Sequence, residues 1–88
     1  MKDRKDKYIA LQNIFFNFDP MEIGVKENNL KDEYDAEISC LLETMVQEPI
    51  ENAEDLKDCL TFIFEEMFGL EPDFEEAFLA EVAVVLEI

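Results

Sequence analysis

The sequence predicts an all-α fold: a compact antiparallel bundle of about four helices in a single domain, residues 1–88. Apolar residues recur at three- and four-residue steps through four segments. Proline or glycine separates these segments, at Pro20, Pro49, Gly69 and Pro72. Hydrophobic residues make up 49% of the chain, with eight Phe, a content that a disordered acidic chain lacks. We therefore expect a folded core.

The first helix is expected from about Asp3 to Phe18, because Tyr8, Leu11 and Phe15 lie on one face. Asp19-Pro20 ends it, since a residue before proline avoids the helical region. Residues 1–7 hold four of the seven cations, and we expect a frayed basic N-terminus there. Asp19 also resembles the cap of a short helical turn, with Pro20 at its first position and Gly24 at its end.

The next two helices have clear start and stop signals. Asp32 is expected to open one helix, which ends near Gln47 before Pro49. Asn52 is expected to cap the next, and Gly69 to end it. The two expected apolar faces consist of Tyr34, Ile38, Leu41, Leu42 and Met45, and of Leu56, Cys59, Leu60, Ile63, Phe64 and Met67.

A fourth helix follows Pro72, with Asp73 and Glu76 as a cap-like pair. Its apolar face consists of Phe74, Phe78, Val82, Val85 and Leu86. Residues 82–88 are rich in β-branched residues, which would also suit a strand. We favour helix, because no partner strand is evident in the sequence.

Composition argues against most chemistry. The chain has no His, so Ser–His and Cys–His nucleophilic pairs are excluded. Cys40 and Cys59 form no CxxC motif, and we interpret them as buried free thiols, with a disulfide between facing helices as the alternative. No calcium-binding loop motif is present, and Ser39 lacks the helix-start position of a carrier serine. We expect no enzyme activity, no cofactor and no dedicated metal site.

Charge is the most informative property of the sequence. The net charge is −16, and residues 32–88 hold eighteen carboxylates against one cation, Lys57. A solubility coat needs a net charge of only about 2 to 8 with mixed signs. The lysines that usually lie four residues after glutamates are absent beyond Lys57. We therefore favour a basic protein partner over a merely solvated surface.

The same charge should repel nucleic acid and anionic membranes. No run approaches the roughly 20 apolar residues that span a bilayer, and no secretory signal is evident, so a cytoplasmic protein is expected. The partner-binding face is assigned to the third helix and the start of the fourth, with Phe62 and Phe68 at its margins and Phe16 and Phe64 as further exposed candidates. Its carboxylates are Glu54, Asp55, Asp58, Glu65, Glu66, Glu71, Asp73, Glu75 and Glu76.

The most distinctive motif is Phe18-Asp19-Pro20, followed by Asp32-Glu33-Tyr34-Asp35. In one interpretation both Asp19 and Asp32 cap helices, and Tyr34 fills the core beneath them. In the other, Asp19, Asp32, Glu33 and Asp35 form an anionic pocket. The motif resembles a family of small, acidic, mostly helical bacterial proteins that is largely uncharacterised. Their members usually have Trp where Phe18 stands, and some resemble immunity proteins of toxin systems.

That resemblance spans about Ile14 to Met45 and implies a short helical domain, without supplying a catalytic residue. Together with the charge, it leads us to expect a stoichiometric inhibitor that neutralises a basic toxin domain, a nuclease, through an acidic surface. The alternative is a non-inhibitory binding or regulatory module for a basic host protein, including nucleic-acid mimicry. The oligomeric state is left open.

Overall fold

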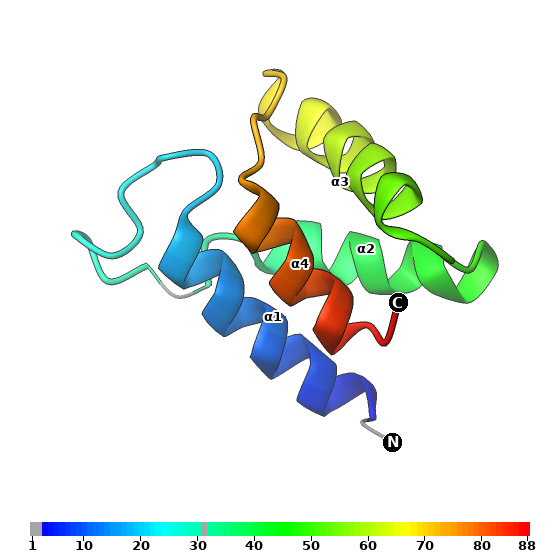
Figure 1. Ribbon diagram of the computed structural model, residues 1–88. Coiled ribbons are helices and arrows are strands. Elements are labelled where there is room, and N and C mark those ends of the chain that lie inside the picture. Colours follow the sequence, from blue (N-terminus) through cyan, green and yellow to red (C-terminus); the bar gives the residue numbers. More distant parts are fainter. Residues whose placement is uncertain (1–2, 31) are drawn as a thin grey trace.

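The computed structural model describes residues 3–30 and 32–88, which form four helices (Figure 1). They are α1 (Arg4–Phe18), α2 (Asp35–Gln47), α3 (Ala53–Phe68) and α4 (Glu76–Val85). These described residues contain no strand, and the expected all-α bundle is confirmed. Residues 82–85 belong to α4, as expected, but the helix ends there and a turn follows at residues 86 and 87.

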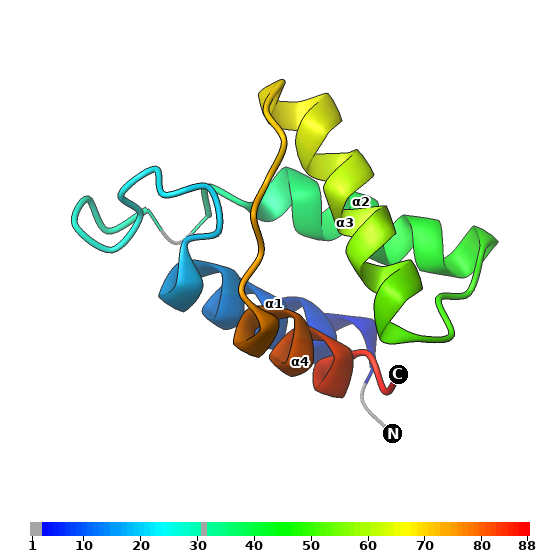
Figure 2. The same cartoon turned by 45° about the horizontal axis from the view of Figure 1, so that its top comes forward.

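The helices pack in a ring in which each contacts two neighbours. α1 packs against α2 and α4, and α3 packs against the same two helices. α1 and α4 lie side by side and run in opposite directions (Figures 1 and 2). The radius of gyration is 12.1 Å, and about 12 Å is typical of a globular chain of this length. The fold is therefore fully compact despite the self-repulsion of its charges.

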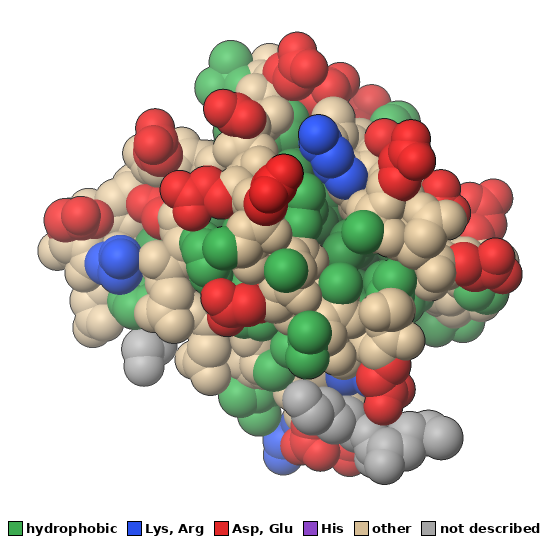
Figure 3. All heavy atoms as spheres, in the orientation of Figure 1, with side chains coloured by type: hydrophobic (Ala, Val, Ile, Leu, Met, Phe, Trp, Pro, Cys, Tyr) green, Lys and Arg blue, Asp and Glu red, His purple; other side chains and the backbone are tan. Residues whose placement is uncertain are grey.

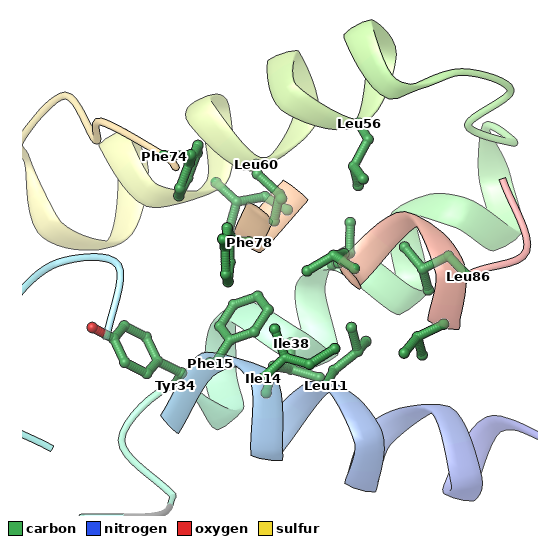
Figure 4. Close-up of a cluster of buried hydrophobic side chains, with 14 of the residues drawn as sticks. Leu11, Ile14, Phe15, Tyr34, Ile38, Leu56, Leu60, Phe74, Phe78 and Leu86 are labelled. Atoms are coloured by element: carbon green, nitrogen blue, oxygen red, sulfur yellow. The ribbon is translucent and has the colours of Figure 1, made fainter. Parts of the chain in front are cut away.

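Aromatic rings fill the centre of the bundle (Figure 4). The Phe15 ring lies 5.1 Å from Phe78, 5.7 Å from Tyr34 and 6.0 Å from Phe64, measured between centroids. The contacts with Phe78 and Tyr34 are edge-to-face, a geometry that aromatic rings prefer and that adds to the burial of apolar area. Phe64 is fully buried, so the expectation that it is available to a partner is wrong. Its place on the inner side of α3, between the other rings, is the reason.

Two expected helix ends are confirmed. The Asn52 side chain accepts a 2.8 Å hydrogen bond from the N–H of Asp55 and caps α3. Gly69 ends α3 with a left-handed φ of 71°. Within the last turn, however, Met67 is exposed rather than part of the buried face. Phe68 turns inward instead, with its ring 5.6 Å from Phe64 and 6.1 Å from Tyr34.

Two other starts differ from expectation. α2 begins at Asp35 after Tyr34, without a side-chain cap, so Asp32 does not open it. α4 begins at Glu76 after Glu75, also without a side-chain cap, so Asp73 does not cap it. The physical reason is burial. Tyr34 and Phe74 are inserted into the core just before these helices, which fixes the chain in non-helical conformations there.

The basic N-terminal segment enters α1 at Arg4. The Asp3 carboxylate accepts a 2.9 Å hydrogen bond from the N–H of Asp6, and α1 is helical from Arg4. Positions 1 and 2 of the expected frayed segment lie outside the described residues.

None of the helices described is long and apolar enough to cross a bilayer.

Candidate functional site

A groove between α2 and α3 is the best candidate for a binding site. Its volume is about 460 Å³. α2 contributes Cys40 and Thr44, and the loop that joins the helices contributes Glu48, Pro49 and Ile50. α3 contributes Asp55, Asp58, Cys59, Phe62 and Ile63. The groove therefore unites part of the predicted acidic face with residues of α2 that sequence reasoning did not assign to it.

Both apolar and acidic groups line this groove. Ile63 is buried in it, and the Phe62 side chain beside it is 66% exposed. Glu48, Asp55 and Asp58 are exposed. The Thr44 hydroxyl donates a 2.8 Å hydrogen bond to the Cys40 carbonyl, so it is already engaged within α2. The groove therefore combines apolar surface with three exposed carboxylates.

Both cysteines line the groove as free thiols. They are half-buried rather than fully buried, and the predicted free-thiol state is confirmed over the disulfide. Burial raises the pKa of the Cys59 thiol, and the neighbouring Cys40 and Glu48 raise it further. Because a reactive cysteine needs a lowered pKa, Cys59 lacks the electrostatics of a catalytic nucleophile.

The remaining predicted binding residues divide between separate surfaces. All nine predicted carboxylates are exposed, but only Asp55 and Asp58 line the α2–α3 groove. Asp73 and Glu75 line a small hollow at the end of α1, beside Pro20 and Glu22. Phe68 is half-buried in the aromatic cluster, which leaves Phe62 as the accessible ring of the predicted pair. Phe16 is half-buried as well.

The charges of the molecule are poorly compensated. Within residues 3–30 and 32–88 a single ion pair forms, between Lys7 Nζ and Glu87 Oε2 at 3.8 Å. Figure 3 shows carboxylates around the margin of one face, with hydrophobic side chains at its centre over α4 and the adjoining part of α3. The exposed Val84 of α4 marks a second apolar surface. In the part of the chain that the structure describes, no group of three or more Cys, Asp or Glu side chains is arranged to hold a metal ion.

The Asp19–Tyr34 motif has a structural explanation. Asp19 ends α1 in a left-handed conformation. A hydrogen-bonded turn follows it, with the Glu22 N–H 2.8 Å from the Asp19 carbonyl, but the turn is not helical and does not extend to Gly24. The Asp19 carboxylate accepts hydrogen bonds from the N–H groups of Ile23, Gly24 and Val25 and from the Tyr34 hydroxyl. Burial by itself would raise the pKa of Asp19, but these four donors more than offset it and lower the pKa.

The other members of the expected anionic pocket do not share that arrangement. Asp32 and Glu33 are exposed, and Asp35 accepts a 2.8 Å hydrogen bond from the Gln12 amide. Tyr34 is buried against Phe15, with its hydroxyl directed out of the core toward the chain that leaves α1 (Figure 4). The interpretation of Tyr34 as a core residue is therefore the one that the geometry supports.

Sequence reasoning missed one buried carboxylate, Glu37. Its side chain is only 4% exposed, and Oε2 has no hydrogen-bond partner among the described residues. Burial raises the pKa of Glu37, and the charges of Glu33 and Asp35 raise it further. Its spacing was the available signal, because Glu37 lies three residues after Tyr34 and directly before Ile38, on the edge of the apolar face.

Comparison of the chain with protein-family models, with curated proteins and with solved structures finds no match in any of the three.

Proposed function

We propose that this protein is a stoichiometric inhibitor, of the immunity or antitoxin kind, that binds a basic toxin domain through α3. The partner best suited to it is a nuclease, because an enzyme that attracts phosphate exposes lysine and arginine. One observation carries the proposal: an exposed aromatic ring, Phe62, stands beside carboxylates that form no ion pair within residues 3–30 and 32–88. Tight interfaces combine an apolar or aromatic centre with a polar rim.

The charge supports this function through both rate and specificity. A surface of one sign speeds encounter with a surface of the opposite sign and disfavours partners of like charge. A rigid acidic surface over a basic active site would also exclude the phosphate groups of the substrate. The ordered helices of the bundle supply that rigidity.

A non-inhibitory acidic module for a basic host protein is the alternative. It rests on the same charge, but it requires only binding. The two functions separate in an activity assay, because an inhibitor abolishes the activity of its partner at a one-to-one ratio and a simple binding module leaves it unchanged.

The decisive experiment is capture of partners from the native host, followed by identification and a titrated activity assay. We expect a basic enzyme whose activity disappears at equimolar protein. Charge reversal of Glu54, Asp55 and Asp58 to Lys should slow association, while the same change at Glu27, Glu43 and Glu81, which are exposed but lie outside the predicted binding face, serves as the control with equal net charge. Binding that is weak for every basic candidate and lost near about 0.5 M salt would contradict the inhibitor.

A further inference from the structure

We infer that the α2–α3 groove receives an amphipathic basic helix of the partner, with one apolar side chain between α2 and α3 and Lys or Arg at the groove edges. This inference rests on the proposed function and names the segment that the site would take. It follows from three properties of the groove: its shape, its arrangement of charge and the chemistry of its walls.

The walls favour a helix over an extended strand. Both are α-helices whose backbone groups are already paired within the helix, and an added strand would find no sheet edge to extend. Residues Cys40 to Glu48 on one wall span about two helical turns, or roughly 12 Å at 1.5 Å per residue. On the facing wall Asp55, Cys59 and Phe62 cover a similar length. Two turns of a partner helix match that length.

The charge of the groove selects a basic helix. The carboxylates of Glu48, Asp55 and Asp58 are not in ion pairs among the residues that the structure places. Among the described residues, Asp55 is the one of the three with a side-chain donor, the Asn52 amide at 3.2 Å from its Oδ2. A Lys or Arg on the partner would supply the missing charge, and its methylene groups would pack beside the apolar wall.

An occupant of the groove must bring apolar side chains as well as positive charge. Ile50, Cys40 and Cys59 are half-buried there, and the Phe62 ring stands exposed beside them. A purely basic, disordered segment would leave these groups in water. A second copy of this chain is a poor occupant, because two molecules of net charge −16 repel each other.

The two thiols provide a direct test, because Cys40 and Cys59 are the only cysteines and both line the groove. The folded protein is alkylated in the presence of a Lys/Leu peptide that forms an amphipathic helix. A peptide of identical composition, scrambled so that its leucines share no face, is the control. At ten times its dissociation constant, the amphipathic peptide should slow alkylation of both thiols about tenfold by mass action. The scrambled peptide should bind more weakly and protect neither thiol.

A matched pair of variants locates the contact. Phe62→Ala should weaken binding of the amphipathic peptide by about tenfold, as expected for an aromatic residue at the centre of an interface. Val84→Ala removes a similarly exposed apolar side chain from α4 and should leave binding unchanged. If Val84→Ala weakened binding of the amphipathic peptide more than Phe62→Ala did, the inference would be overturned in favour of the α4 surface.

The remaining outcomes separate this inference from the proposed function. Equal binding of both peptides without thiol protection would overturn the groove, since charge alone would then explain binding. Absence of binding by the amphipathic peptide would overturn it as well. Inhibition of a captured enzyme by a complex in which both thiols stay reactive would overturn the groove while the inhibitor function holds. Protection by the amphipathic peptide without any inhibited enzyme would support the groove and contradict the inhibitor.

Discussion

The hydroxyl of Tyr34 donates a 2.6 Å hydrogen bond to the Asp19 carboxylate, which joins the end of α1 to the start of α2 across fifteen positions of sequence. The same hydroxyl accepts a 3.1 Å hydrogen bond from the N–H of Met21. The connector between the helices is therefore organised by one acid and one phenol. Its left-handed residues, including Glu22 at φ 53°, are held in place by this network.

Removal of the Tyr34 hydroxyl tests that network. Tyr34→Phe keeps the ring in contact with Phe15 and deletes both hydrogen bonds of the hydroxyl, the one donated to the Asp19 carboxylate and the one accepted from the Met21 N–H. The free energy of unfolding should fall by about 1–3 kcal/mol. Urea denaturation at neutral pH measures the change. An unchanged midpoint would mean that water or another donor replaces the hydroxyl at no cost.

The acid dependence of stability should report Asp19. Its carboxyl has a pKa below the ordinary 3.8, so it contributes stability above that value and loses it as pH falls through the lowered folded-state pKa. Asp19→Asn should therefore destabilise the protein at pH 7 and differ progressively less from the parent as the pH falls below 3.8. Urea midpoints measured along a pH series test this. A constant difference between the two proteins would contradict it.

The contribution of Glu37 to stability should have the opposite pH dependence. The pKa of this carboxyl is raised above the ordinary 4.5, so its contribution to stability is greatest below that value and is lost as pH rises through the folded-state pKa. Glu37→Met removes the buried carboxylate, whose Oε2 has no hydrogen-bond partner among the described residues, at similar volume. It should stabilise the protein at pH 7 by about 1–3 kcal/mol. Glu43→Met, on the exposed side of α2, is the control and should change stability by less than about 0.5 kcal/mol.

The two glycines should differ in their tolerance of a side chain. A Cβ at Gly69 would meet no atom within 4 Å, so Gly69→Ala should incur only the left-handed backbone penalty of about 1–2 kcal/mol. At Gly24, with φ +78°, a Cβ would also lie 3.1 Å from the Asn28 amide, which hydrogen-bonds the Gly24 carbonyl. Thermal unfolding should therefore rank Gly24→Ala as the less stable variant. The reverse order would contradict the role of that contact.

Added salt should stabilise the fold. The net charge is −16, and the described residues form a single ion pair. Screening by salt therefore relieves more repulsion than it weakens attraction. The melting temperature should rise between low salt and about 0.15 M NaCl, where the Debye length is about 8 Å. Sucrose at matched osmolarity is the control for solvent exclusion. A flat response to NaCl would mean that the carboxylates lie far enough apart to interact little.

The local signals in the sequence determined most of the fold. Apolar spacing predicted four helices, and Asn52 and Gly69 placed the ends of α3 correctly, because a cap and a terminator act within one turn. The exposure of Phe62 followed from its position at the margin of the apolar stripe. The free state of the cysteines was likewise predicted.

Tertiary structure decided what depends on distant partners. Aspartate is a residue type that favours helix caps. The Asp19 carboxylate instead accepts hydrogen bonds from the Tyr34 hydroxyl and three backbone N–H groups, and these bonds organise the loop after α1. α2 and α4 begin later than the sequence predicted, because Tyr34 and Phe74 are buried in the core just before them. The sequence did not predict the groove, because its α2 wall and its α3 wall come together only when the two helices pack. Helical periodicity tells which residues face inward, whereas the contacts between helices determine which surfaces become concave.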